Sequence, residues 1–209
     1  MSLTKEEIKY FKQLNTPWKI QNYINKIPIN FEESGDTCYS PKRVLKENKC
    51  HCIEGAILAA LILRINGHPP LIVDLEASSQ DFDHVIAVFK VHDHWGAISK
   101  TNHAILRYRE PIYKSIRELI MSYFHEYHNE DGKKTLRKFS SPVNLSRFDQ
   151  LGWMHTEDNV WYVPEYLLKV KHYNILTRKQ IARLKKIDEI EMQTRKVTEW
   201  ESEKAKKNL

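Results

Sequence analysis

The spacing of apolar and polar residues predicts short helices in the first part of the chain. Thr4 and Glu7 stand at capping-box spacing, which predicts a helix over residues 4–14. Proline follows Thr16 and Ser40 directly, and a proline in the first turn is typical of a helix that begins there. Two further short helices are therefore expected before the most apolar segment of the chain.

That apolar segment predicts a central, buried helix. It runs from Cys52 to Ile65 and ends in Asn66-Gly67, a pair that commonly terminates helices. Apolar side chains would cover nearly every face of this helix, so we expect the rest of the fold to enclose it.

Strand patterns follow the central helix. Residues 71–75 form a short apolar run that predicts a buried strand, and a second begins at His84. A hairpin turn is expected at His92-Asp93, between the His84 strand and the segment 95–98. Residues 104–108 are expected to form a third strand.

The remaining part of the chain predicts two more helices. Residues 115–127 carry an apolar stripe at helical spacing, and a long charged helix is expected from Thr177 to about Val197. The pattern of residues 159–170 does not decide between strand and helix. Helices followed by a small antiparallel sheet predict an α+β fold, with one domain over residues 1–175, a core at about 37–110, and a helical extension over 176–209.

Length and composition fit one packed domain with an appendage. The chain has 209 residues, 41% of them hydrophobic, and no apolar run approaches the roughly 20 residues that span a bilayer. The polar start shows no signal or transit peptide pattern. Three cysteines form a poor disulfide framework and suit a reducing compartment. We therefore expect a cytoplasmic protein without a membrane partner.

The net charge of +6 comes mostly from the last third of the chain. The basic residues there are Lys169, Lys171, Arg178, Lys179, Arg183, Lys185 and Lys186. Such a set can contact nucleic acid or anionic lipid, but a solvated helix face is the commoner explanation, so a nucleic-acid partner is not expected. The six glycines form no phosphate-binding loop. The sequence does not indicate an oligomeric state.

The N-terminus of the central helix offers a candidate nucleophile. Cys52 stands at the positive end of the helix macrodipole, which favours the reactive thiolate over the thiol. His84 opens the strand that is expected to pack on this helix. Burial of the helix against that strand would bring sulfur and imidazole together, as a cysteine acyl-transfer catalyst requires.

A residue that orients the imidazole can be sought from the hairpin geometry. A turn centred on His92-Asp93 places Thr101 opposite His84 and Ser99 diagonally beside it, on the same face. Asn102 would reach this face if the strand had one bulge. Either Ser99 or Asn102 can orient the ring, and neither is a carboxylate. We favour Asn102 over Ser99, because it gives a Cys-His-Asn set of the papain kind.

These residues carry a family resemblance. Cys52-Ile-Glu-Gly-Ala, the run Leu-Ile-Leu-Arg-Ile-Asn-Gly67, His84 and Trp95 resemble the core of the transglutaminase-like superfamily over roughly residues 37–102. Cys-x-Glu is also similar to the arylamine N-acetyltransferases, which share the fold. The whole chain is most similar to a bacterial branch of the superfamily. The resemblance implies a papain-like fold with Cys52 as nucleophile and His84 as base. Ser99 stands where the family usually has an aspartate.

Two plainer interpretations compete with catalysis. A cysteine in an apolar helix is most often a small core residue, and His84 can be a hydrogen-bonded strand-end histidine. The segments Cys50-His51-Cys52 and His92-Asp93-His94 contain possible zinc ligands, to which Cys38, His84 and His103 could add. Their spacing is not that of structural zinc sites, so no metal or cofactor is expected.

The sequence thus predicts a cysteine enzyme that hydrolyses amides or transfers acyl groups, with a peptide, amide or acyl substrate. Cys52 and His84 would perform the chemistry, and Asn102 or Ser99 would orient the ring. The alternative is a catalytically weakened or inactive papain-like binding module. Its aromatic anchors would be Trp153, Trp161, Tyr162 and Tyr166.

Overall fold

The computed structural model describes residues 3–201, and within this range helices and an antiparallel sheet form an α+β fold, as predicted. The helices are α1 (Lys5–Gln13), α2 (Pro17–Asn25), α3 (Pro41–Glu47), α4 (Cys52–Ile65), α5 (Ile116–Met121), the 3₁₀ helix η1 (Leu145–Leu151), α6 (Tyr162–Leu167), α7 (Arg178–Ile181) and α8 (Glu189–Lys196). The strands are β1 (Leu71–Ala77), β2 (His84–Val91), β3 (His94–Ser99), β4 (Arg109–Tyr113), β5 (Leu136–Ser140), β6 (Val143–Asn144) and β7 (His172–Asn174).

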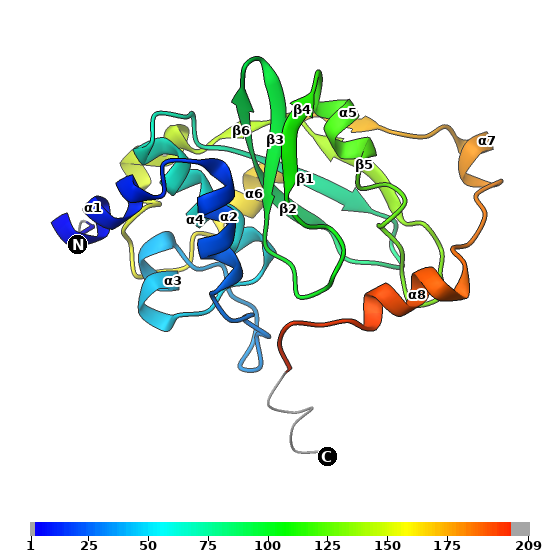
Figure 1. Cartoon of the computed structure of the whole chain (residues 1–209), viewed down its shortest axis with the longest axis horizontal. Helices are drawn as coiled ribbons and strands as arrows, with labels where there is room; N and C mark the ends of the chain where they lie inside the picture. Colours follow the sequence, from blue (N-terminus) through cyan, green and yellow to red (C-terminus); the bar gives the residue numbers. More distant parts are fainter. Residues whose placement is uncertain (1–2, 202–209) are drawn as a thin grey trace.

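The strands pair in the order β4-β3-β2-β1-β5-β7, and the short β6 also pairs with β1. Figure 1 shows α1, α2, α3 and α4 together on one side of the sheet and α5 on the other. Because side chains alternate along a strand, each strand contributes to both sides. In β2, Val85 and Ala87 belong to the core around α4, whereas Ile86 and Val88 belong to the core around α5.

Helix α4 lies at the centre of the larger core, as its apolar sequence predicts. Its residues from Ile53 to Leu63 are all buried, and it packs against β2 and against α1, α2 and α3. The helix ends where Gly67 takes a left-handed backbone conformation with φ of +89°. There the N–H of His68 donates to the carbonyl of Leu63, closing the helix end.

Glycine at position 55 lets α4 approach the chain that follows β3. A Cβ atom added at Gly55 would lie 2.5 Å from Cβ of Lys100, which is too close for two carbon atoms. The side chain of Lys100 is fully buried, and its Cβ atom cannot move without the backbone. The ammonium group of Lys100 donates to the carbonyls of Ile24 and Ile27, which fixes the lysine in place.

We therefore expect Gly55→Ala to lower the free energy of unfolding by about 1–3 kcal/mol, the usual cost of overpacking a core. Urea unfolding of the variant measures the loss. Ala56→Gly, one residue further along the same helix, is the matched control, because it removes a methyl group instead of adding one. An unchanged stability for Gly55→Ala would contradict the close approach.

The first three helices begin where their capping residues predict. Thr4 caps α1 in a capping box with Glu7, and Ser40 accepts a hydrogen bond from the N–H of Arg43 at the start of α3. The hairpin of β2 and β3 turns at His92 and Asp93, both with positive φ, as predicted.

Two predicted elements are wrong. Residues 104–108 form a loop, and the strand β4 begins at Arg109. Leu106 has a positive φ, and its N–H donates to the carboxylate of Glu126, so this segment does not pair with β3. The long helix expected from Thr177 is broken into α7 and α8, because Ile187 is buried and its N–H donates to the carbonyl of Gly132. The last part of that expected extension, residues 202–209, lies outside the described residues.

The segment that the sequence left undecided, 159–170, is helical over α6. Between residues 3 and 201, the structure has no helix with the length and hydropathy needed to cross a bilayer.

Candidate active site

The ends of three elements meet at the candidate site. Cys52 is the first residue of α4, His84 is the first residue of β2, and Ser99 is the last residue of β3. His84 lies close enough to Cys52 that its imidazole lowers the pKa of the thiol. The Oγ atom of Ser99 lies 2.8 Å from Nε2 of His84. The structure thus brings together three of the four predicted site residues.

The hydrogen bonds of Ser99 determine the orientation of the imidazole. Oγ of Ser99 lies 2.5 Å from the carbonyl oxygen of Leu106, to which the hydroxyl must donate its one hydrogen. The same oxygen therefore accepts a hydrogen bond from Nε2–H of His84. Nε2 of His84 is therefore occupied by Ser99, and Nδ1 is the ring nitrogen that can exchange a proton with the sulfur of Cys52. A general acid or base needs such a free nitrogen.

The backbone of Ser99 is held by a side chain from α2. The buried amide of Gln21 donates to the carbonyl of Ser99 over 2.8 Å and accepts from the N–H of Ser99 over 2.9 Å. These paired bonds fix the end of β3 relative to the helical layer. No local pattern predicts this role, because Gln21 is 78 positions from Ser99.

The surroundings of Cys52 favour the thiolate. Burial by itself raises the pKa of this thiol, but hydrogen bonds from His51 and His84 and the positive charge of both imidazoles outweigh burial and lower the pKa to about 5. A free cysteine ionises near ~8.5, so Cys52 has the electrostatic environment of a reactive cysteine.

His51 is a second imidazole beside the sulfur, and its sequence context predicted only a possible metal ligand. Burial lowers the pKa of His51, but the hydrogen bond to Cys52 and the negative charges of Cys52, Glu54 and Glu32 raise the pKa to about 9. Nε2 of His51 lies 3.4 Å from a carboxylate oxygen of Glu32 and 3.4 Å from one of Glu54. His51 is therefore protonated at neutral pH and adds positive charge next to the thiolate.

Glu54 is a fully buried carboxylate whose oxygens accept several hydrogen bonds. They come from the hydroxyl of Thr37 at 2.7 Å, the N–H of Tyr39 at 2.8 Å, the N–H of His51 at 3.0 Å and the amide of Asn30 at 3.2 Å. Such a network compensates the cost of burying the charge. It also fixes the first turn of α4 and the segment that precedes it.

Asn102 is the predicted site residue that the structure does not bring to His84. Its amide pairs with the backbone of Trp200, with two hydrogen bonds of 2.9 Å. The ladder between β2 and β3 ends at the pair Ile86–Ser99, so Asn102 lies beyond the sheet. No bulge turns it toward the imidazole, and the preference for Asn102 over Ser99 is wrong on geometry.

The other two cysteines differ from Cys52 in their surroundings. Cys38 and Cys50 are buried and free of disulfides. Burial raises the pKa of Cys38 far above the usual value, and burial raises that of Cys50 to about 12 even though Lys100 opposes this effect. Of the three thiols, Cys52 is the one whose pKa is lowered.

Two of the histidines considered as zinc ligands, His94 and His103, each have a ring nitrogen beside a backbone carbonyl oxygen. Nδ1 of His94 lies 2.7 Å from the carbonyl oxygen of His92 in the hairpin turn, and Nδ1 of His103 lies 2.7 Å from the carbonyl oxygen of Arg195. Among residues 3–201, no three His, Cys, Asp or Glu side chains are arranged to hold a metal ion.

A cavity of about 140 Å³ lies beside His84, and Thr101, Leu106, Tyr127 and Arg195 also line it. The hydroxyl of Tyr127 donates to the carbonyl of Phe82 over 2.6 Å, which holds the loop before His84. Cys52 is not among the residues that line this cavity.

The aromatic residues that a binding module would use are mostly not exposed. Trp153 is fully buried, and Tyr162 and Tyr166 pack against Phe148. Trp161, with 41% of its surface exposed, is the one that is open to solvent. This cluster belongs to the core more than to a docking surface.

The two predicted orienting residues can be separated by mutation. We expect Ser99→Ala to reduce the alkylation rate of Cys52 by up to about tenfold below pH 5, because the imidazole loses a hydrogen bond worth about 1–1.5 kcal/mol and the pKa of Cys52 rises by about one unit. Asn102→Ala, which removes a side chain bonded to Trp200 and not to His84, is the comparison and should reduce the rate less than Ser99→Ala does. Equal effects of the two substitutions on the rate would contradict the assigned geometry.

Comparison with models of known protein families gives no match for this chain, and comparison with curated protein sequences gives none either.

Proposed function

We propose that this protein is a cysteine acyl-transfer enzyme with a papain-like arrangement, in which Cys52 is the nucleophile and His84 carries the proton. The observation that supports it best is a thiol at a helix N-terminus with a lowered pKa, beside a histidine that opens the adjacent strand. Nε2 of that histidine is held by a polar side chain. A buried helix packed on an antiparallel sheet provides the corresponding frame.

In the acylation step, the thiolate of Cys52 attacks the carbonyl carbon of an amide or ester. A carbon–sulfur bond forms, and the electron pair of the carbonyl double bond moves to oxygen. The imidazolium of His84 then gives its proton to the leaving amine or alcohol as the bond to that group breaks. The backbone N–H of Cys52, at a helix end where N–H groups lack helical partners, is placed to stabilise the oxyanion.

In the second step, water or an amine attacks the thioester carbon, and His84 accepts its proton. The carbon–sulfur bond breaks, and the thiolate–imidazolium pair forms again. Attack by water completes hydrolysis, whereas attack by an amine completes acyl transfer. Both outcomes use the same residues, so the attacking group decides between them.

The charge of His51 helps this site to work without a carboxylate next to His84. Ser99 orients the ring through a neutral oxygen, which stabilises imidazolium less than an aspartate would. A protonated His51, held by Glu32 and Glu54, adds positive charge at the sulfur itself. Cys52 is therefore ionised by two imidazoles instead of by one imidazole and its carboxylate.

Reaction with p-nitrophenyl acetate tests the proposal. We expect rapid release of p-nitrophenol and a mass increase of one acetyl group on the peptide that contains Cys52. Cys52→Ala should abolish both, whereas Cys38→Ala, which removes a buried thiol, should abolish neither. Acetylation of several residues at equal rates, or an unchanged release by Cys52→Ala, would refute the nucleophile. Adding a primary amine to the acetylated protein then distinguishes transfer from hydrolysis.

A further inference from the structure

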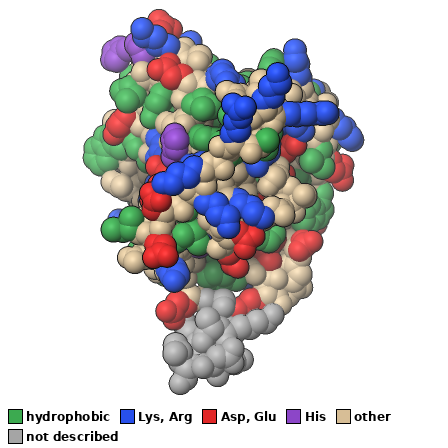
Figure 2. Space-filling model, turned by 90° about the vertical axis from the view of Figure 1, so that its right-hand side faces the viewer, with side chains coloured by type: hydrophobic (Ala, Val, Ile, Leu, Met, Phe, Trp, Pro, Cys, Tyr) green, Lys and Arg blue, Asp and Glu red, His purple; other side chains and the backbone are tan. Residues whose placement is uncertain are grey.

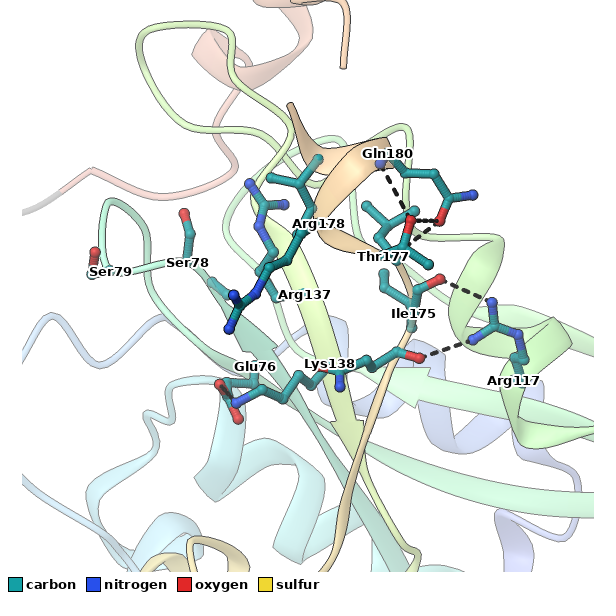
Figure 3. A pocket seen from close by; sticks show the side chains of 14 residues that line it. Glu76, Ser78, Ser79, Arg117, Arg137, Lys138, Ile175, Thr177, Arg178 and Gln180 are labelled. Carbon is teal, nitrogen blue, oxygen red and sulfur yellow. Dashed lines mark hydrogen bonds and ion pairs between the residues drawn. The ribbon is translucent and has the colours of Figure 1, made fainter. Parts of the chain in front are cut away.

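A larger cavity lies at the C-terminal end of β1, where the sheet edge of β5 and β7 meets α7. Its volume is about 820 Å³, within the range of sites for small molecules. Residues of β1, α5, β5 and α7 line it, and Figure 3 shows their side chains around it. The side chains of Cys52, His51, His84 and Ser99 are not part of its lining. This second cavity is separate from the candidate active site.

Positive charge dominates the lining. Arg117, Arg137, Lys138 and Arg178 face one carboxylate, that of Glu76. The carboxylate of Glu76 is paired with the ammonium of Lys138 at 2.5 Å, so it does not neutralise the arginines. Figure 2 shows Lys and Arg side chains gathered on the side of the molecule where α7 lies in Figure 1.

The three arginines have no carboxylate partner among the described residues. Arg117 donates to the carbonyls of Asn174 and Ile175, which fixes its guanidinium at the rim. Arg137 uses one nitrogen, Nη1, for the carbonyls of Lys134 and Leu136, and burial lowers its pKa. Within residues 3–201, the side chain of Arg178 forms no hydrogen bond or ion pair, and its backbone carbonyl accepts from the N–H of Ala182. The cavity therefore concentrates guanidinium groups that still have donors to offer.

The chemistry of the lining selects the kind of ligand. Guanidinium groups bind phosphate oxygens through paired hydrogen bonds, and the hydroxyls of Ser78 and Ser79 add neutral donors at the same wall. No aromatic side chain lines the cavity, so it lacks the stacking surfaces that sites for single-stranded nucleic acid use. These features favour a compact anion over a polynucleotide.

We propose that this cavity binds a small phosphorylated molecule, whose phosphate groups are held by Arg137 and Arg178 with Arg117 at the rim. The inference goes beyond the acyl-transfer function and does not depend on it. It also gives a role to Arg178, one of the basic residues for which a solvated helix face was expected.

Isothermal titration of the full chain with pyrophosphate tests this site. We expect saturable binding at one site per chain, weakened about tenfold by Arg178→Gln, because a hydrogen bond to a charged group is lost. The double variant Arg137→Gln/Arg178→Gln should bind too weakly to measure. Arg178 has no contact that folding needs, so its single variant remains informative if the double variant is unstable.

The matched control removes two charges outside the cavity. Lys169→Gln/Lys179→Gln should keep the affinity for pyrophosphate within twofold, and Cys52→Ala should not change it. No binding by the wild-type chain at millimolar pyrophosphate would overturn the proposal. Tighter binding of a single-stranded RNA or of phosphatidic acid vesicles, with the lysine variant weakened as much as the arginine variant, would also overturn it. That result would indicate an extended basic surface instead.

Discussion

Iodoacetamide should alkylate Cys52 with a rate that rises through pH 5 and levels off above about pH 6.5. The thiolate is the reactive form, and the pKa of this thiol is lowered to about 5, so ionisation is nearly complete where a free cysteine is still about one per cent ionised. A thiolate of low pKa is intrinsically less nucleophilic, which offsets much of the gain in rate. The pH midpoint, measured by mass spectrometry of the labelled peptide, is therefore the decisive quantity.

Substitution of either histidine should move this midpoint upward. His84→Ala and His51→Ala each remove a hydrogen bond and a positive charge from the sulfur, so we expect a rise of about 1–2 pH units for each. In the double variant burial acts alone, and the midpoint should reach or exceed ~8.5. His125→Ala, on an exposed position, is the control. A midpoint near that of free cysteine in the wild-type chain, unchanged by His84→Ala, would remove the basis for a nucleophilic role.

Removal of the buried carboxylate of Glu54 should strongly lower the stability of the protein. We expect Glu54→Ala to lower the free energy of unfolding by about 3–5 kcal/mol, because it leaves buried donors on Thr37, Tyr39 and His51 without an acceptor. Urea unfolding measures this change.

The same substitution should also raise the pKa of Cys52, since His51 loses a negative neighbour and holds its proton less firmly. The control is Glu47→Ala, which removes an exposed carboxylate from α3. It should change the free energy of unfolding by less than 0.5 kcal/mol. A similar small change for Glu54→Ala would mean that water replaces the carboxylate as the acceptor.

Capping residues, prolines and the turn residues of the hairpin correctly predicted the helix starts and the hairpin, because interactions between sequence neighbours determine them. A capping box at Thr4 and prolines after Thr16 and Ser40 set where the first helices begin. The turn at His92-Asp93 fixed the hairpin register, and with it the face that Ser99 shares with His84. In these cases neighbouring residues carry the information, so a single sequence is enough.

Distant contacts decided what the sequence could not predict. The break between α7 and α8 comes from the burial of Ile187 against a loop over fifty positions earlier. His51 stands next to Cys52 in sequence, but its charge depends on Glu32, a residue of another segment. Residues that meet only in the folded protein, such as His51 and Glu32, produce no periodic pattern in the sequence. The position of His51 directly before Cys52, at the N-cap of α4, was the one local indication of a second imidazole at the sulfur.

The pairing of Asn102 with Trp200 gives the chain end an indirect influence on reactivity. Backbone bonds from Ala104 to Val197 and from Glu199 to Asn102 hold the loop that carries Leu106, the acceptor for the hydroxyl of Ser99. Proteolytic cleavage before Val197 would release that loop, and hydrogen exchange at Leu106 should then accelerate. A tag or fusion partner is therefore better attached at the amino terminus, because strain near position 200 would reach the imidazole through two hydrogen bonds.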